Sequence, residues 1–174
     1  MNDPDPVSAS PRKRRWLRYA FEVLLFVLVL TALQMYQTRE VADGVAPAFE
    51  GVLLDGSPVS LASVQERPLL LHFWASWCPV CKLEQGTVQR ISKDYAVLTV
   101  SIDTMPPQKL LDWMAAEGVS YPVVTDASGT ISQRYGIRGV PASLVIDRNN
   151  RIRFTEVGYT TETGLRLRLW WAGR

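Results

Sequence analysis

The first strong pattern in the chain is an apolar run over residues 16–36, uninterrupted from Val23 to Leu30. As a helix this run would be about 31 Å long, which matches the hydrocarbon thickness of a bilayer. Its charged residues, Arg18 and Glu22, are four apart and can pair on one face. We therefore predict a transmembrane helix over 16–36. A cleaved signal peptide and a buried core helix are the alternatives, although residues 34–37 offer no small-x-small cleavage site.

Basic residues over 12–15 precede this run and indicate its orientation. The positive-inside rule keeps such a segment in the cytoplasm and exports the chain that follows. The expected organisation is a basic cytoplasmic N-terminus over 1–15, the transmembrane helix, a polar tether over 37–45 and one folded domain over 46–174.

Downstream, short apolar runs alternate with stretches of helical spacing. The runs predict strands over 49–54, 59–61, 69–75, 96–102, 122–125, 142–147 and 151–157. The helical spacing predicts helices over 79–94, 107–118 and 128–135. The end is ambiguous, because Leu165, Leu167 and Leu169 alternate as in a strand, whereas Thr160 or Thr161 can cap a helix. The expected fold class is α/β, with a mixed central sheet and helices on both faces.

The charge balance of the exported part excludes one class of function. From Gly44 onward, 13 Lys and Arg residues stand against 12 Asp and Glu residues. The pattern contains neither a basic stripe nor an acidic tail, so nucleic-acid binding is not expected.

The two cysteines of the chain, Cys78 and Cys81, lie at the junction between a predicted strand and a predicted helix. Cys78 falls near the N-cap and Pro79 at the first helical position, where proline is favoured. The helix dipole then favours the thiolate of Cys78, which we expect to be exposed, while Cys81 points inward. A zinc site would need more ligands than His72 supplies, and an inert disulfide over so short a loop would stabilise little.

Residues 73–82 (FWASWCPVCK) resemble the active-site stretch of the thioredoxin superfamily, and residues 135–141 (YGIRGVP) resemble its cis-proline signature. The resemblance covers the chain from about residue 46 and implies a thioredoxin fold. It implies a catalytic redox disulfide between Cys78, which attacks a substrate disulfide, and Cys81, which resolves the mixed disulfide. It also implies substrate binding by Trp77, Val140 and Pro141, with Pro141 in the cis form beside the sulfurs.

Glu84 and His72 are the candidates for proton transfer near the cysteines. In membrane-tethered TlpA- and ResA-like reductases, a glutamate stands three residues after the second cysteine and is followed two residues later by proline. Here Gly86 replaces that proline, and a solvated helix glutamate is the alternative for Glu84. His72 stands where thioredoxins carry a buried aspartate, and a hydrogen-bonded core histidine is its alternative role.

The C-terminal stretch 167–172 (LRLWWA) most resembles the protein D group of the suppressor-for-copper-sensitivity system. These are membrane-anchored thioredoxin-like oxidoreductases of Gram-negative bacteria. The resemblance implies a single-pass protein of the inner membrane with its C-terminal domain in the periplasm and a role in copper tolerance. It implies protein disulfides as substrates and a transmembrane protein as electron donor, with no bound cofactor or metal. For Trp170 and Trp171 we expect docking on the domain core rather than contact with a membrane surface.

Two other functions are kept as alternatives. A cytochrome c maturation reductase is one, although Ala142 stands where that family has a glutamate after the cis proline. A Cu(I)-binding module is the other, since two thiolates suit a soft cation.

Overall fold

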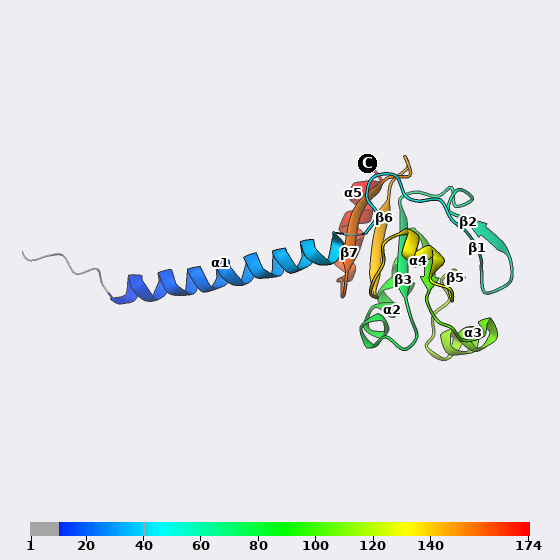
Figure 1. Ribbon diagram of the computed structural model, residues 1–174, viewed down its shortest axis with the longest axis horizontal. Coiled ribbons are helices and arrows are strands. Elements are labelled where there is room, and N and C mark those ends of the chain that lie inside the picture. Colours follow the sequence, from blue (N-terminus) through cyan, green and yellow to red (C-terminus); the bar gives the residue numbers. More distant parts are fainter. Residues whose placement is uncertain (1–10, 40) are drawn as a thin grey trace, which may run out of the picture. The chain divides into compact units, whose positions relative to one another are not determined.

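The computed structural model describes residues 11–39 and 41–174, and it divides into two units, Met1–Arg39 and Glu40–Arg174. Most of the first unit is one continuous helix, α1 (Pro11–Thr38), which includes the predicted helix over 16–36 (Figure 1). Within the described part of the chain, no helix combines the length and the apolarity needed to cross a membrane. Residues 1–10 of the predicted basic segment lie outside the described residues.

The second unit is built on a five-stranded sheet with strand order β5-β4-β3-β6-β7. The central strand β3 (Leu69–Trp74) pairs in parallel with β4 (Ala96–Ser101) and antiparallel with β6 (Ala142–Ile146). The outer strands are β5 (Val123–Thr125), parallel to β4, and β7 (Ile152–Val157), antiparallel to β6. A separate hairpin is formed by β1 (Glu50–Val52) and β2 (Pro58–Ser60).

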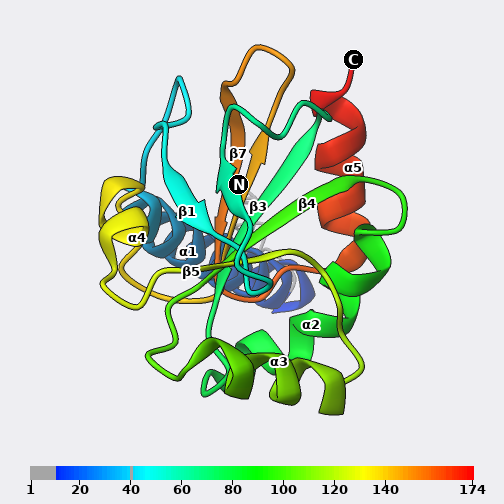
Figure 2. The ribbon, with the colours of Figure 1, turned by 90° about the vertical axis from the view of Figure 1, so that its right-hand side faces the viewer.

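Strand alternation divides the side chains of β3 between two apolar clusters. Leu70 and Trp74 belong to the cluster under α2 (Pro79–Ile91), α3 (Pro107–Ala116) and α5 (Glu162–Ala172). Leu69, Leu71 and Phe73 belong to the other cluster, which is covered by α4 (Thr130–Arg134) and by residues around the β1–β2 hairpin. Figure 2 shows α2, α3 and α5 on one side of the sheet and α4 on the other. The α/β fold with helices on both faces is thereby confirmed.

The closing segment, which the sequence left ambiguous, is the helix α5. Thr161 is its N-cap, and the Thr161 side chain accepts a hydrogen bond of 3.2 Å from the Gly164 amide. Leu165 and Leu169, one helical turn apart, are fully buried, whereas Leu167 is 61% exposed. The apparent strand alternation therefore arose from one outward-facing leucine between two inward-facing ones.

The chain entering the domain packs on it before β1 begins. The Ala42 amide donates to the Tyr135 carbonyl at 2.9 Å, and the Ala46 amide donates to the Asn150 carbonyl at 2.8 Å. Val45 bridges Arg151 in antiparallel fashion. This end of the predicted tether is thus held against the turn between β6 and β7.

Candidate active site

The dithiol lies where β3 ends and α2 begins. Cys78 is the N-cap of α2 and Pro79 occupies its first turn, as predicted. The Cys78 sulfur accepts a hydrogen bond of 3.2 Å from the Cys81 amide, so the sulfur satisfies one of the free N–H groups of the helix start. Both cysteines are in the free thiol form. The positive end of the helix dipole therefore lies at the sulfur of Cys78 and not at that of Cys81.

Both sulfurs are recessed, which corrects the expectation of an exposed Cys78. Cys78 is 4% exposed and Cys81 is 3% exposed. The Cys78 thiol contacts the Val140 carbonyl oxygen at 3.5 Å, so the loop that begins β6 covers it. The resemblance places this loop beside the sulfurs, but the local sequence around Cys78 does not show how far the loop buries the thiol.

The surroundings of the two thiols make them chemically unequal. Burial raises the pKa of the Cys81 thiol well above its ordinary value, and the hydrogen bond with Cys78 raises it further. The negative charges of Cys78 and Glu84 act in the same direction. Cys81 therefore stays protonated at neutral pH and needs a base before it can attack.

Glu84 is fully buried, which excludes the solvated glutamate considered from the sequence. Its Oε1 atom accepts a hydrogen bond from the Thr160 amide, and its Oε2 atom has no hydrogen-bond partner among the described residues. Burial raises the pKa of Glu84 to about 7, against a partly offsetting effect of the Thr160 bond. The glutamate thus faces the protein interior although Gly86 replaces the expected proline.

His72 lies on β3 and is buried beside Ser143 of β6. Its Nδ1 atom lies 2.9 Å from the Ser143 hydroxyl oxygen, and burial lowers the pKa of His72 to about 4. The imidazole is therefore neutral at pH 7 and is a weak base. Its geometry is that of a hydrogen-bonded core histidine, and Glu84, which acts on the pKa of Cys81, is the better placed of the two proton-transfer candidates.

The loop before β6 carries Val140 and Pro141, two of the three residues for which the resemblance implies substrate binding. The Val140–Pro141 peptide bond is cis, as expected from the resemblance. The Pro141 carbonyl accepts a hydrogen bond of 2.8 Å from the Gly158 amide. Beside the dithiol, Trp77 is 64% exposed and Val80 is 37% exposed, so an apolar surface surrounds the recessed sulfurs.

Asp103 is a site residue that the sequence reasoning missed. Its buried carboxylate accepts bonds of 2.9 and 2.7 Å from the amide and hydroxyl of Ser76, and a bond of 2.7 Å from the Ser101 hydroxyl. These contacts fix the loop that precedes Cys78. A signal existed, because Asp103 directly follows the strand predicted over 96–102, and the carboxyl ends of parallel strands meet at one edge of a sheet.

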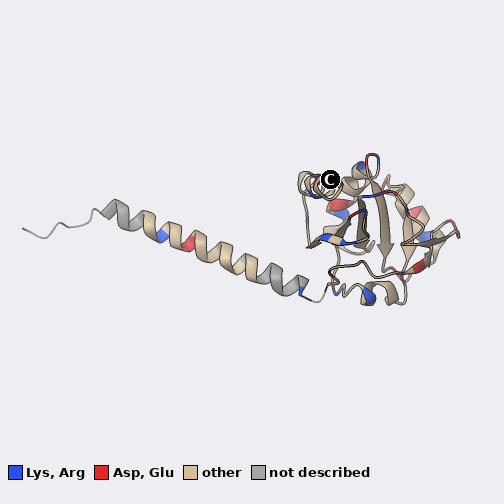
Figure 3. Ribbon diagram, turned by 90° about the horizontal axis from the view of Figure 1, so that it is seen from above, with Lys and Arg blue, Asp and Glu red and all other residues tan. Residues whose placement is uncertain are grey.

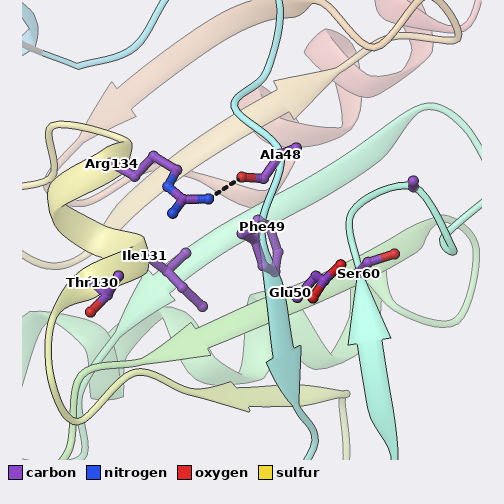
Figure 4. Close-up of a pocket in the computed structure, with 8 residues that line it drawn as sticks. Ala48, Phe49, Glu50, Ser60, Thr130, Ile131 and Arg134 are labelled. Carbon is purple, nitrogen blue, oxygen red and sulfur yellow. Dashed lines mark hydrogen bonds between the residues drawn. The ribbon is translucent and has the colours of Figure 1, made fainter.

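A separate pocket of about 410 Å³ lies on the opposite side of the sheet, between α4 and the β1–β2 hairpin. Figure 4 shows the Arg134 guanidinium directed at the Ala48 carbonyl, to which it donates at 2.5 Å. Neither cysteine lines this pocket. Among the residues that the structure describes, no group of three or more His, Cys, Asp or Glu side chains could hold a metal ion.

Comparison with known proteins agrees with this geometry. Residues 41–166 match the model of the Redoxin family. The chain is 26% identical to the thiol-disulfide oxidoreductase ResA of Halalkalibacterium halodurans over 87% of this chain and 90% of that protein. It is 27% identical to the thiol:disulfide interchange protein DsbE of Tatumella citrea, over 79% of this chain and 84% of that protein.

A solved structure is similar as well. The crystal structure of StoA from Bacillus subtilis superposes with a TM-score of 0.59 at 27% identity, covering 73% of this chain and 98% of that one. The family match spans most of the chain and includes both cysteines, the Pro141 loop and Glu84. The chain therefore belongs to the Redoxin family and is a thioredoxin-like thiol-disulfide oxidoreductase of the ResA, DsbE and StoA type, with its Cys-x-x-Cys pair at positions 78 and 81.

Proposed function

We propose that this protein is a membrane-anchored periplasmic enzyme that reduces protein disulfides. The observation that carries the proposal is the inequality of the two thiols, with Cys78 capping α2 and Cys81 buried and protonated. Such a pair suits a two-step exchange in which one sulfur attacks first and the other waits.

In the first step the Cys78 thiolate attacks one sulfur of a substrate disulfide. A Cys78–substrate disulfide forms, and the other substrate sulfur leaves as a thiolate. Cys81 then loses its proton and attacks Cys78, which releases the second substrate thiolate and leaves a Cys78–Cys81 disulfide. Two electrons pass to the substrate, and a dithiol of the membrane donor restores the reduced pair by the same exchange in reverse.

Glu84 is the proposed acceptor of the Cys81 proton. A carboxylate with a pKa near 7 is ionised in part of the molecules at neutral pH and can take a proton without holding it too firmly. Its unpartnered Oε2 atom is open to such a proton. His72, whose pKa is about 4 and whose Nδ1 pairs with Ser143, is less suited to this role.

The proposed anchor is the first helical unit. Between Glu22 and Arg39 the sequence contains no charged residue. Eleven large hydrophobic side chains from Trp16 to Val29 are exposed, each over at least 48% of its surface. So much apolar surface is unfavourable in water and is favourable in hydrocarbon. The basic residues at 12–15 would place the dithiol domain in the periplasm by the positive-inside rule.

A role in copper tolerance and a transmembrane electron donor are part of the proposal. Their support is the resemblance of residues 167–172 to the protein D group. The burial of Cys81 argues against the Cu(I)-binding alternative, because a metal carrier would present both sulfurs. A purified protein that binds Cu(I) tightly yet reduces no disulfide would reverse this preference.

The test is the resting redox state of Cys78 and Cys81 in intact cells, trapped by acid and thiol alkylation. We expect a mostly reduced pair that becomes oxidised when membrane electron donors are deleted. A mostly oxidised pair in unstressed cells would contradict the reducing direction and indicate a disulfide-forming enzyme. Normal c-type cytochromes in a deletion strain would exclude the cytochrome c maturation alternative.

A further inference from the structure

The outer face of α5 carries apolar side chains that the domain does not cover. Leu167 is 61% exposed, Trp170 44% and Trp171 60%, so the expected docking of the two tryptophans on the core is wrong. The three residues follow the spacing i, i+3 and i+4, which places them on one side of α5, and Arg174 comes two residues after the end of that helix. We call Leu167, Trp170 and Trp171 the α5 stripe.

Charge around the α5 stripe changes along the helix. Near its start, Arg166 pairs with Glu162 and Asp94 at 2.9 and 2.7 Å, so the cation there is balanced. At its end, the Arg174 guanidinium lies 3.5 Å above the Trp170 ring. The Arg148 guanidinium donates to the Gly173 carbonyl, which brings a second cation to the same end.

The turn between β6 and β7 adds to this positive end. Arg148 and Arg151 on the turn are exposed, while its acid, Asp147, is buried at 7% exposure. Figure 3 looks down on this end of the domain, with Lys and Arg in blue. Tryptophan beside arginine is the combination that favours the interface of an anionic bilayer, where the ring sits among the headgroups.

The path of the chain connects the same end to the proposed anchor. Val45 bridges Arg151, and only seven residue steps separate Val45 from Thr38 at the end of α1. Seven residues span at most about 24 Å. A membrane that holds α1 therefore keeps the β6–β7 turn, and with it the end of α5, within reach of its surface.

We propose that the α5 stripe, with Arg148 and Arg174 beside it, rests on the anionic lipid surface of the membrane. The inference depends on the proposed anchor. A domain held on the membrane in this way would also have its active site facing in a fixed direction. Gly173 packs beside Pro68, immediately before β3, whereas Cys78 follows the other end of that strand. Six strand residues span about 20 Å, so the dithiol faces away from the bilayer and toward soluble substrates.

The test uses the full chain with Cys78→Ser and Cys81→Ser, reconstituted in nanodiscs that contain phosphatidylglycerol. An environment-sensitive fluorophore is attached at Leu167→Cys or, as the matched control, at Ala116→Cys. Ala116 is exposed at the end of α3, and Figure 2 shows α3 and the C-terminal end of α5 at opposite ends of the domain. Headgroup-nitroxide lipids should quench the label at 167 about twofold more than the label at 116.

Three results would overturn the proposal in different ways. Equal quenching at the two positions, in protein that stays in the nanodisc, would refute the lipid contact and leave the anchor standing. Full chain that fails to co-float with vesicles would refute the anchor and this inference with it. A blue shift in the emission of the fluorophore at position 167 that appears without lipid and grows with protein concentration would show that the α5 stripe contacts a second copy of the chain instead of the membrane.

A second variant tests whether the attached fluorophore, rather than the α5 stripe, causes the contact with lipid. Trp170→Gln with Trp171→Gln, in the 167-labelled chain, should reduce the quenching to the level of the control position. The same two substitutions in the chain with both cysteines should leave insulin reduction in solution unchanged, because neither tryptophan contacts the dithiol. Undiminished quenching in the double variant would contradict the proposal.

Discussion

At the scale of single residues, two buried ionisable groups near the active site have pKa values displaced in opposite senses. Burial disfavours the charged form of each group, so the pKa of Glu84 rises to about 7 and the pKa of His72 falls to about 4. Both groups are therefore neutral in the folded protein near pH 6. In the unfolded chain each group is charged over part of the pH range in which the folded protein keeps it neutral, so each makes the free energy of unfolding depend on pH.

Glu84 should lower stability as pH rises. Between pH 4.5, its ordinary pKa, and about 7, the folded protein keeps a proton that the unfolded chain releases. The free energy of unfolding then falls with pH, by about 3 kcal/mol across the window. Glu84→Gln removes this loss, so the variant should become more stable relative to wild type as the pH is raised from 5 to 8. Urea unfolding under reducing conditions measures this difference. For the exposed control Glu66→Gln, the difference in free energy of unfolding from wild type should not change with pH. If the difference between Glu84→Gln and wild type were also independent of pH, the prediction would be contradicted.

His72 should have the reverse effect. Between pH 6.5 and about 4 the unfolded chain takes up a proton that the folded protein refuses, so stability falls by about 3 kcal/mol as pH falls. His72→Asn should therefore gain stability relative to wild type as the pH is lowered from 7 to 4. Ser143→Ala, which keeps the imidazole, should keep the acid sensitivity. Because the two groups oppose one another over nearly the same window, wild type alone should show a shallow profile.

At the scale of elements, the active site depends on how strand ends are joined to the loops beside them. β3 and β4 run in parallel, and Asp103 after β4 holds Ser76 after β3 through two hydrogen bonds. The loop before Cys78 is thereby fixed from a neighbouring strand rather than from within itself. Side chains that join two elements in this way contribute to both the fold and the geometry of the thiol.

Asp103→Asn should weaken this junction. The amide keeps one acceptor oxygen but sets an N–H₂ group against the Ser76 or Ser101 donors, so buried polar groups lose their partners. Hydrogen bonds to a buried charge contribute about 1.5–3 kcal/mol each, and we expect the free energy of unfolding to fall by about 3 kcal/mol. Insulin reduction by the folded variant should also slow. Asp112→Asn, at an exposed position of α3, is the control and should change stability little.

Much of this arrangement could be predicted from sequence pattern, and the part that could not has a physical reason. The order of strands and helices and the place of Cys78 and Pro79 follow from local spacing and capping preferences. The burial of Glu84 does not, because the Thr160 amide that covers it is distant in the chain, and the resemblance that places the Val140 loop beside Cys78 does not show how deeply that loop buries the thiol. The local sequence pattern indicates where a helix starts, whereas the burial of a side chain on that helix depends on which distant segment of the chain packs against it.

At the scale of the whole molecule, the dithiol and the point where the chain enters the domain lie at opposite ends of the central sheet. The dithiol follows the carboxyl end of β3, and the entering chain meets the β6–β7 turn near the other end. The dithiol therefore lies at one end of the sheet, and the chain from α1 enters the domain at the other. The recessed sulfurs add a restriction on access, since each is at most 4% exposed.

Burial of the dithiol should appear as selective alkylation. In the folded, reduced protein we expect iodoacetamide to modify Cys78 first, because its sulfur receives the helix amide, and to leave Cys81 protonated and unmodified. A bulky maleimide should react with the folded protein several-fold more slowly than iodoacetamide, relative to their rates in urea. Mass spectrometry of timed samples, with Cys78→Ser and Cys81→Ser as references, would measure this. Equal labelling of both cysteines in the folded protein would contradict it.

The short segment from Gly158 to Thr160 links two parts of the site. Its first amide is bonded to the Pro141 carbonyl and its last to the Glu84 carboxylate. We expect that a substrate which displaces the Pro141 loop would change the hydrogen bond of Glu84 and, with it, the affinity of that carboxylate for a proton. Binding equilibria are reciprocal, so protonation of Glu84 must change substrate affinity by the same factor. If Glu84 takes the Cys81 proton as proposed, the pH of the surroundings would act on substrate binding as well as on the resolving step.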